Sequence, residues 1–260
     1  MPWNERVTHL LRDLPLPHLD EAWRRRCIQL LDFTSLNAND DEESIALFCQ
    51  KARTSLGDVA GVCVYPDFVR LVADQFAGTS VKAVTVVNFP KGDSLLETVL
   101  AEINMAITAG AQEIDVVFPY KRYLNKETAF AKDFISACKA ACGDKLLKVI
   151  LETSALHDLE IIADASRDAF LAGADFIKTS TGKLATGASL EAAAVMLLVA
   201  QSLQAEKPDV GVKVSGGINR LVDAALYMSV AEKIQGAAWV TPQHFRIGAS
   251  RLLGELVKGE

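Results

Sequence analysis

The sequence predicts an α/β protein folded as a (β/α)8 TIM barrel with an extra N-terminal helix. From residue 30 onward, short apolar runs rich in β-branched residues alternate with longer segments of helical periodicity. Eight such strand–helix units occupy about 230 residues, which matches the order and size of a barrel. The runs are almost continuously apolar, as is typical of parallel strands that are covered on both faces.

Each expected strand is a short apolar run, and the first already carries polar residues near its carboxyl end. In chain order, the eight expected strands are LLDFTSL (30–36), VAGVCVY (59–65), VKAVTVVNF (81–89), QEIDVVF (112–118), LLKVILE (146–152), ADFIKTS (174–180), VGVKVS (210–215) and HFRIGA (244–249).

The segments between the strands have helical periodicity, as in 93–110 and 157–173. Both of these end in glycine, which is typical of a helix C-terminus. A further helix, expected near 19–29, precedes the first strand and could cap the lower mouth of the barrel. No linker, repeat or low-complexity tract divides the chain. We therefore expect one barrel domain over 1–260, with 1–29 as an N-terminal helical extension.

An open, doubly wound parallel sheet is the competing fold. That fold predicts a Gly-x-Gly-x-x-Gly turn after the first strand, and the sequence has none there. The barrel is therefore the favoured interpretation.

Composition excludes several classes of function. The chain has 260 residues and a formal net charge of −6, which argues against a nucleic-acid or anionic membrane surface. No apolar run is long enough to span a membrane. The five cysteines are odd in number and lack Cys-x-x-Cys spacing, so neither a zinc site nor a disulfide framework is indicated. The N-terminus lacks the apolar core of a secretory signal, and we expect a cytoplasmic protein.

The segment ADFIKTSTGK (174–183) is the most informative part of the chain. Its Lys178 ends an apolar strand, just before a turn of small polar residues. In a barrel, the carboxyl ends of the strands form the active-site face, so this amine would point at a cavity lined by loops. A neutral lysine in such a place can condense with an aldehyde or ketone to form a Schiff base.

A second lysine, Lys213, lies near the end of the neighbouring strand. To lower the pKa of an ordinary lysine to near 7, its environment must disfavour the charged form by roughly 4.6 kcal/mol. An ammonium about 6 Å away contributes roughly 2.8 kcal/mol at an effective dielectric of 20, and desolvation can supply the rest. A single lysine at a strand end more often extends towards solvent. The pair on adjacent strands favours Lys178 as nucleophile and Lys213 as its electrostatic perturber.

Asp115 lies in EIDVVFPY (113–120), inside a strand that is otherwise apolar. A buried carboxylate without a partner is unfavourable, so one interpretation is a structural ion pair with a lysine, for which Lys148 is a candidate. A carboxylate beside a Schiff base can also move protons. Both interpretations stay open.

Two glycine-containing turns follow strands seven and eight, at 214–219 and 247–250, and each precedes a helical pattern. Barrels often bind phosphate at these loops through backbone N–H groups. Tight turns without a ligand are the alternative. The candidate phosphate-binding residues are Gly216, Gly217, Gly248, Ser250 and Gly182, with Lys183 beside them.

Other candidate motifs are weaker. Gly182 and Lys183 do not form a nucleotide P-loop, because Ile177 and Leu184 stand where that motif needs Gly and Ser or Thr. The four histidines share no metal-ligand spacing. Cys63, in the second strand, is expected to be a core thiol near the site, since a reactive thiol would need a depressed pKa.

Taken together, these segments resemble the deoxyribose-phosphate aldolase family over about residues 25–255. The matching blocks, in the same order, are LDFTSLN, GVCVYP, TVVNFP, EIDVVFPY, LLKVILET, ADFIKTSTGK, VKVSGGIN and HFRIGAS. The resemblance implies a metal-free, cofactor-free class I aldolase that reversibly cleaves 2-deoxy-D-ribose 5-phosphate into acetaldehyde and D-glyceraldehyde 3-phosphate. It also implies small sugar-phosphate and aldehyde partners and a homodimer.

The resemblance further implies roles for individual residues. Lys178 would form the Schiff base, and Asp115 with Lys213 would relay protons. Asp32, Thr34, Cys63 and Lys183 would bind the substrate, with Asp32, Thr34 and Lys183 contacting its hydroxyls directly or through water. The phosphate would rest on Gly182, Gly216, Gly217, Gly248 and Ser250. The chain departs from the family at Asn219, where members often carry a basic residue, and at Arg251, where a relative can have serine.

Two other functions stay open at this point. One is a Schiff-base barrel that acts on a longer ketose phosphate. The other is a non-catalytic barrel that senses sugar phosphates, which would keep the glycine turns but would not need two lysines on adjacent strands.

Overall fold

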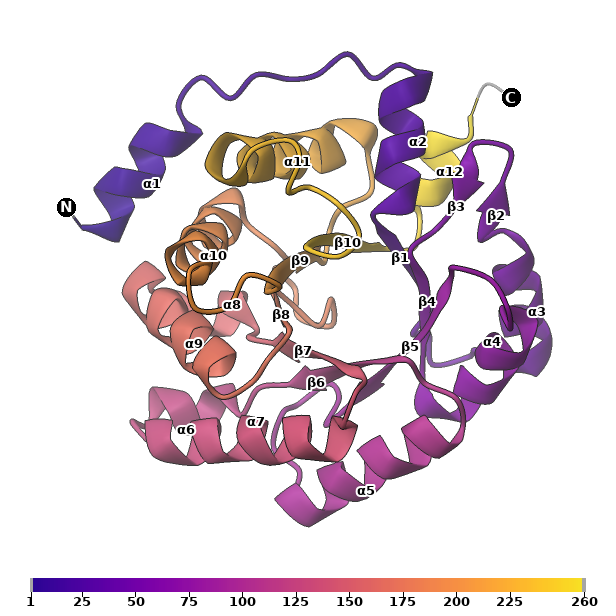
Figure 1. The fold of residues 1–260 in the computed structure, drawn as a ribbon, viewed down its shortest axis with the longest axis horizontal. Helices are drawn as coiled ribbons and strands as arrows, with labels where there is room; N and C mark the ends of the chain where they lie inside the picture. Colours follow the sequence, from indigo (N-terminus) through magenta and orange to yellow (C-terminus); the bar gives the residue numbers. More distant parts are fainter. Residues whose placement is uncertain (1, 259–260) are drawn as a thin grey trace.

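Eight parallel strands close into a barrel with helices around it (Figure 1). The computed structural model describes residues 2–258, so Met1, Gly259 and Glu260 of the expected domain lie outside the described residues. The strands pair in the cyclic order β1-β10-β9-β8-β7-β6-β5-β4, which confirms the barrel and excludes the open sheet. Their bounds are β1 Leu31–Thr34, β4 Gly61–Val64, β5 Lys82–Val87, β6 Glu113–Val117, β7 Leu146–Ile150, β8 Phe176–Lys178, β9 Gly211–Ser215 and β10 Phe245–Ala249.

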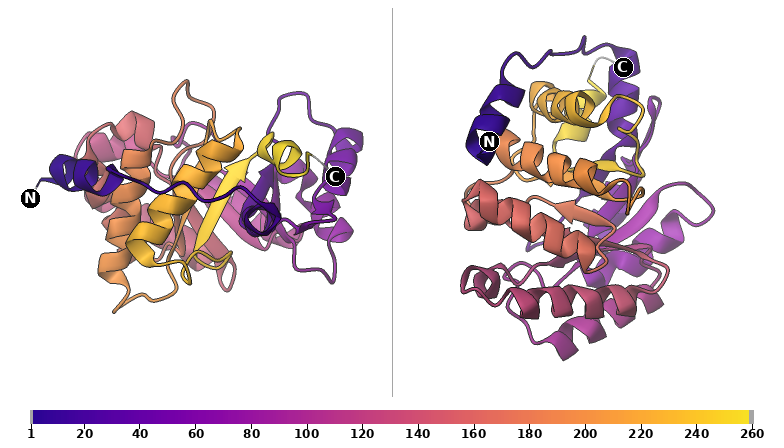
Figure 2. Two further views of the ribbon diagram at one scale, coloured as in Figure 1. Left: turned by 90° about the horizontal axis from the view of Figure 1, so that it is seen from above. Right: turned by 60° about the vertical axis from the view of Figure 1, so that its left-hand side comes forward.

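Helices follow the strands and cover the outside of the barrel, as the two side views show (Figure 2). The two helices expected at 93–110 and 157–173 are confirmed as α5 and α9. The helices that follow β1 are α3 Glu42–Gln50, η1 Pro66–Phe68, α4 Val69–Gln75, α5 Leu96–Thr108, α6 Tyr120–Leu124, α7 Thr128–Cys142, α8 Thr153–Leu156, α9 Leu159–Leu171, α10 Leu190–Leu203, α11 Leu221–Gln235 and α12 Leu252–Leu256.

The N-terminal extension contains two helices, α1 Trp3–Leu11 and α2 Glu21–Gln29, of which only the second is expected from the sequence. The segment between them runs along α11, where Ser229 Oγ donates a hydrogen bond to the Pro15 carbonyl. α1 packs beside α10 and also touches α9 (Figure 1).

α2 is confirmed as a helix, and its Arg26 donates hydrogen bonds to the Ala237 and Val240 carbonyls in the loop before β10. It packs against α12 and a short hairpin formed by β2 Arg53–Thr54 and β3 Gly57–Asp58. Gln29, the last residue of α2, lines a cavity of about 550 Å³ together with Lys82 and Arg246 at the lower mouth. Gln29 thus places the end of α2 beside the lower mouth.

The interior of the barrel is charged as well as apolar. Strand register places Lys178 of β8 opposite Lys213 of β9, and Lys213 opposite Arg246 of β10. Asp115 of β6 lies opposite Lys148 of β7. Barrel interiors are usually filled by branched apolar side chains, so this concentration of buried charge indicates a specialised site.

Candidate active site

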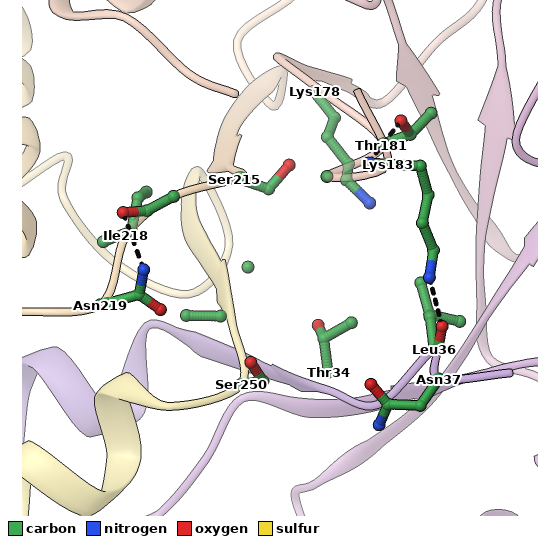
Figure 3. A pocket seen from close by; sticks show the side chains of 15 residues that line it. Thr34, Leu36, Asn37, Lys178, Thr181, Lys183, Ser215, Ile218, Asn219 and Ser250 are labelled. Atoms are coloured by element: carbon green, nitrogen blue, oxygen red, sulfur yellow. Dashed lines mark hydrogen bonds between the residues drawn. The ribbon is translucent and has the colours of Figure 1, made fainter. Parts of the chain in front are cut away.

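A polar cavity of about 190 Å³ opens at the carboxyl ends of the strands (Figure 3). This is the face on which barrel enzymes carry their active sites. The cavity brings together eight of the residues singled out from the sequence. They are Thr34, Lys178, Gly182, Lys183, Gly216, Gly217, Gly248 and Ser250.

Lys178 is the buried amine of this cavity. Its side chain is only 3 % exposed, and its Nζ lies 2.9 Å from Asp115 Oδ2. The Nζ of Lys213 lies 2.8 Å from the same carboxylate oxygen. The two lysines are therefore held close together by one shared oxygen, as their adjacent strands predict.

Asp115 is also bound by Lys148, whose Nζ lies 2.9 Å from its other oxygen. Lys148 is thus a partner of Asp115, as the structural interpretation expected. It is shared with Glu113, whose Oε2 lies 2.6 Å away. The carboxylate of Asp115 therefore contacts three ammonium groups at once.

A second carboxylate, Asp32, lies behind Lys213. Its Oδ2 is 2.6 Å from Lys213 Nζ, and its Oδ1 is 2.6 Å from Arg246 Nη1. Arg246 also contacts Glu113, with 2.9 Å between Nη2 and Oε1. These contacts join one buried charged network, which consists of Asp32, Glu113, Asp115, Lys148, Lys178, Lys213 and Arg246.

The network contains three carboxylates and four cationic side chains. Among residues 2–258, Lys178 contacts a single carboxylate, whereas Lys148, Lys213 and Arg246 each contact at least two. If Lys178 is neutral, the numbers of positive and negative groups become equal. Buried charge is tolerated best when it is balanced, so Lys178 is the member from which a proton is most easily removed.

The pKa shifts of Lys178 and Lys213 agree with this charge balance. Burial lowers the pKa of Lys178 and the charge of Lys213 lowers it further, while Asp115 acts in the opposite sense. Burial also disfavours the charged form of Lys213, but Asp115 and Asp32 raise the pKa of that lysine above its ordinary value. Desolvation therefore lowers the pKa of Lys178 more than the ammonium group of Lys213 does. The sequence predicts the reverse order of these two causes.

Asp32 and Cys63 do not line the cavity. Asp32 is fully buried among cations, which hold its pKa low against the effect of burial. Cys63 is fully buried and packs with Leu36, Val84 and Val86, and burial raises the pKa of its thiol. The thiol is therefore unreactive where it lies, as expected for a core cysteine.

Thr34 and Lys183 line the cavity on the side of β1. Thr34 Oγ1 donates a hydrogen bond of 2.7 Å to the Asp32 carbonyl. The Nζ of Lys183 donates to the Leu36 carbonyl and lies 6.0 Å from the centre of the Tyr65 ring. Within residues 2–258, no carboxylate lies within ion-pair distance of Lys183, so its charge is free for a ligand.

The opposite side of the cavity is built from glycine backbone. Gly182, Gly216 and Gly217 have φ values of +76°, +91° and +83°, which L side chains rarely adopt. A Cβ on Gly216 would lie 2.9 Å from Gly187 Cα, so the two loops touch through their backbones. Ser250 lines the same side. Exposed backbone at such turns can bind an anion.

Glu152 organises the turn after Lys178, a role that the sequence does not predict. It is buried in a left-handed conformation, with φ +55°. Its Oε2 accepts hydrogen bonds from the backbone N–H and the hydroxyl of Thr181. The only sequence signal was a carboxylate at the end of an apolar strand. Glu113 and Arg246 have no predicted role either. Glu113 could have been found, because it lies two residues before Asp115 on the same strand face, whereas Arg246 is the only charged residue of its strand.

Within residues 2–258, no group of three or more His, Cys, Asp or Glu side chains is arranged to hold a metal ion. Over the same part of the chain, every helix is too short or too polar to cross a membrane.

Similar proteins carry the same fold over nearly the whole chain. A crystal structure of a "putative deoxyribose-phosphate aldolase" from Coccidioides immitis is 30% identical, with a TM-score of 0.79, covering 98% of this chain and 95% of that one. A protein of the same description from Toxoplasma gondii ME49 is 28% identical, with a TM-score of 0.81 and coverages of 91% and 94%. The tetrameric deoxyribose phosphate aldolase from Aeropyrum pernix is 25% identical, with a TM-score of 0.75 and coverages of 97% and 96%.

The family comparison agrees with these structures. The sequence model described as "DeoC/LacD family aldolase" matches residues 26–254, which include every member of the charged network and every residue that lines the cavity. The chain belongs to the DeoC/LacD family of aldolases.

Proposed function

We propose that this aldolase reversibly cleaves 2-deoxy-D-ribose 5-phosphate to acetaldehyde and D-glyceraldehyde 3-phosphate, with Lys178 as the Schiff-base lysine. The observation that carries the proposal is the position of Lys178: a desolvated amine, paired to a single carboxylate, in a polar cavity at the carboxyl ends of the strands. The names of the similar solved structures support the choice of substrate.

The reaction begins when neutral Lys178 attacks C1 of the open-chain sugar. Loss of water gives an iminium ion, which draws electrons from the C2–C3 bond. That bond breaks as a base takes the proton of the C3 hydroxyl, and glyceraldehyde 3-phosphate leaves. The remaining enamine is protonated at C2, and hydrolysis of the resulting iminium ion releases acetaldehyde and the free amine.

Asp115 and Lys213 are proposed to relay protons in these steps. Both groups lie directly behind Lys178, and Asp115 Oδ2 touches both amines at 2.9 and 2.8 Å. A proton can therefore pass along this pair as Lys178 changes between amine, iminium and enamine forms. Asp32 is proposed to act through Lys213, since it is shielded from the cavity.

The other cavity residues are proposed to bind the sugar phosphate. Lys183 and Thr34 would meet substrate hydroxyls on one side. The phosphate would lie on the other side, against Ser250 and the backbone of the glycine turns. Those residues are Gly182, Gly216, Gly217 and Gly248.

Three further points are predictions about the setting of the reaction. We propose that it serves deoxyribonucleoside catabolism, because nucleoside breakdown supplies deoxyribose phosphates. We also propose a cytoplasmic location and a homodimer. Cell fractionation and light scattering on the purified chain would check the last two.

Reductive trapping tests the nucleophile. Acetaldehyde with borohydride should leave an ethyl group on Lys178, found by peptide mapping, because the imine forms at this amine. Lys178→Ala should abolish both adduct and turnover, whereas the surface variant Lys132→Ala should keep both. A barrel that only senses sugar phosphates would give no site-selective adduct, and a variant at Lys178 that retains even a few per cent of activity would contradict the assignment.

Donor specificity separates this proposal from a ketose-phosphate aldolase. In the synthetic direction, acetaldehyde should serve as donor with glyceraldehyde 3-phosphate as acceptor. Turnover with dihydroxyacetone phosphate as donor, but not with acetaldehyde, would favour the longer substrate.

A further inference from the structure

We propose that Arg246, which lies outside the catalytic cavity, sets the charge state of Lys178 through a buried chain of ion pairs. Arg246 is thus a positioning residue, and the negative charge of Glu113 opposes its effect on Lys178. The inference rests on the proposed function only in taking Lys178 as the reacting amine.

The chain of contacts between the two side chains is continuous. Arg246 Nη1 lies 2.6 Å from Asp32, and Asp32 lies 2.6 Å from Lys213. Lys213 lies 2.8 Å from Asp115 Oδ2, the oxygen that Lys178 contacts at 2.9 Å. Every side chain in this series of ion pairs is at most 5 % exposed, so solvent only weakly screens the electrostatic effect of Arg246 on Lys178.

Arg246 lies close enough to Lys178 for its charge to matter. It is opposite Lys213 on one neighbouring strand, and Lys213 is opposite Lys178 on the next. Two strand spacings separate the two backbones by about 10 Å, and we take this as the separation of the two charges. At that distance and an effective dielectric of 20, one unit charge moves a pKa by roughly one pH unit.

The charge balance fixes the direction of the effect. With Lys178 protonated, the network holds four cations against three carboxylates. Removing the charge of Arg246 makes these numbers equal while Lys178 is protonated. The ammonium form of Lys178 is then more stable, and its pKa should rise. Removing the charge of Glu113 has the reverse effect.

The charged and titratable groups that surround Lys178 directly are Asp115 on β6, Lys213 on β9 and Cys63 on β4. Behind them lie Asp32, Lys148, Glu113 and Arg246.

The two partners of one ion pair therefore give opposite predictions. Arg246→Gln should move the acid limb of the kcat/KM profile for 2-deoxy-D-ribose 5-phosphate up by about one pH unit, since Lys178 then holds its proton more strongly. Glu113→Gln should move the limb down by a similar amount. The double variant should return it close to the position in the unmodified protein.

A second readout does not depend on the substrate. The pH midpoint of Lys178 acetylation by acetic anhydride, measured by peptide mapping, reports the amine directly and should shift in the same directions. If the unmodified chain does not cleave the sugar phosphate, the proposed function fails, while the acetylation midpoints still test the inference.

Arg246→Lys is the matched control, because it keeps the charge while losing the two-pronged contact with Glu113. Its midpoint should stay near that of the unmodified protein. Circular dichroism would identify any variant that fails to fold; if Arg246→Gln does, then the downward shift in Glu113→Gln and its reversal in the double variant decide the matter. Shifts of both single variants in one direction, or no shift in Glu113→Gln, would overturn the inference.

Discussion

At the scale of single residues, Lys178 and Lys213 show how two similar amines acquire different states. Both are buried and both touch Asp115 Oδ2. Lys213 has a second carboxylate, Asp32, and its pKa is raised, whereas Lys178 has one carboxylate and a lowered pKa. One additional carboxylate partner thus keeps Lys213 charged, whereas Lys178, which lacks it, can become a neutral nucleophile.

This difference predicts the pH dependence of the reaction. The pKa of Lys178 lies below the ordinary 10.5, so the amine is protonated below its shifted pKa and neutral above it. The value of kcat/KM should therefore fall as the pH is lowered through that pKa and should level off above it. A pH–rate profile would check the sign; a rate that rises towards acid pH would contradict it.

Asp115→Asn should lower kcat by about 10²–10⁴-fold, the usual range for losing a proton-transfer group. The substitution keeps the size of the side chain but leaves three ammonium groups with less compensation. The free energy of unfolding should also fall, by about 3–5 kcal/mol, because buried cations lose their partner. Urea unfolding and steady-state kinetics would measure the two effects. A fully active variant would remove Asp115 from the proposed relay.

The sequence indicates which residues lie at the carboxyl ends of strands but not the depth at which each side chain lies. Lys178 and Lys213 could be paired because adjacent strands place them together. Asp32 was expected near substrate, yet it points into the interior network and is fully buried. Arg246 could not be found, because its partners come from β1 and β6, far away in the sequence.

At the scale of elements, the glycine turn after β9 shapes the cavity through backbone contact. Gly216 approaches Gly187 so closely that a Cβ would lie 2.9 Å from its Cα. At the next residue, Gly217, a Cβ would meet no described atom within 4 Å, although φ is +83°. Both positions need glycine for conformation, and only Gly216 needs it for space.

Gly216→Ala should therefore be more damaging than Gly217→Ala. Each substitution should cost about 1–3 kcal/mol of stability through the positive φ. Gly216→Ala should in addition raise KM for the sugar phosphate, because it separates the two loops. Gly254→Ala, where a Cβ would meet no described atom within 4 Å, is the control. Equal KM values for the two turn variants would show that the close approach has no role in binding.

The eight strands were predictable because each is a nearly continuous apolar run. The parts that were missed are short or weakly patterned. α1 has apolar residues at Trp3, Val7, Leu10 and Leu11, which is helical spacing, but the segment is short and half polar. The β2–β3 hairpin has two residues in each strand, which is too few for an alternating pattern.

At the scale of the whole molecule, the barrel closes by pairing its first strand with its last. Leu31, Asp32 and Phe33 lie opposite Ile247, Gly248 and Ala249. Arg246 and Asp32 reinforce the same junction from inside. The N-terminal and C-terminal parts of the chain are therefore held in one continuous sheet.

We accordingly propose that the chain unfolds as a single domain. Far-UV circular dichroism and tryptophan fluorescence should give coincident transitions in urea, because closure of the sheet makes each strand depend on its neighbours. Two separated transitions would contradict the single-domain prediction.

The N-terminal helix has a consequence for solubility. Most side chains of α10 are buried although it lies in the outer ring, and α1 packs beside it. Removal of residues 2–11 by a protease should expose the part of α10 that α1 contacts, and Glu191 is the only charged residue within α10. The shortened protein should self-associate more readily through this newly exposed apolar surface, so we expect α1 to protect the barrel against aggregation.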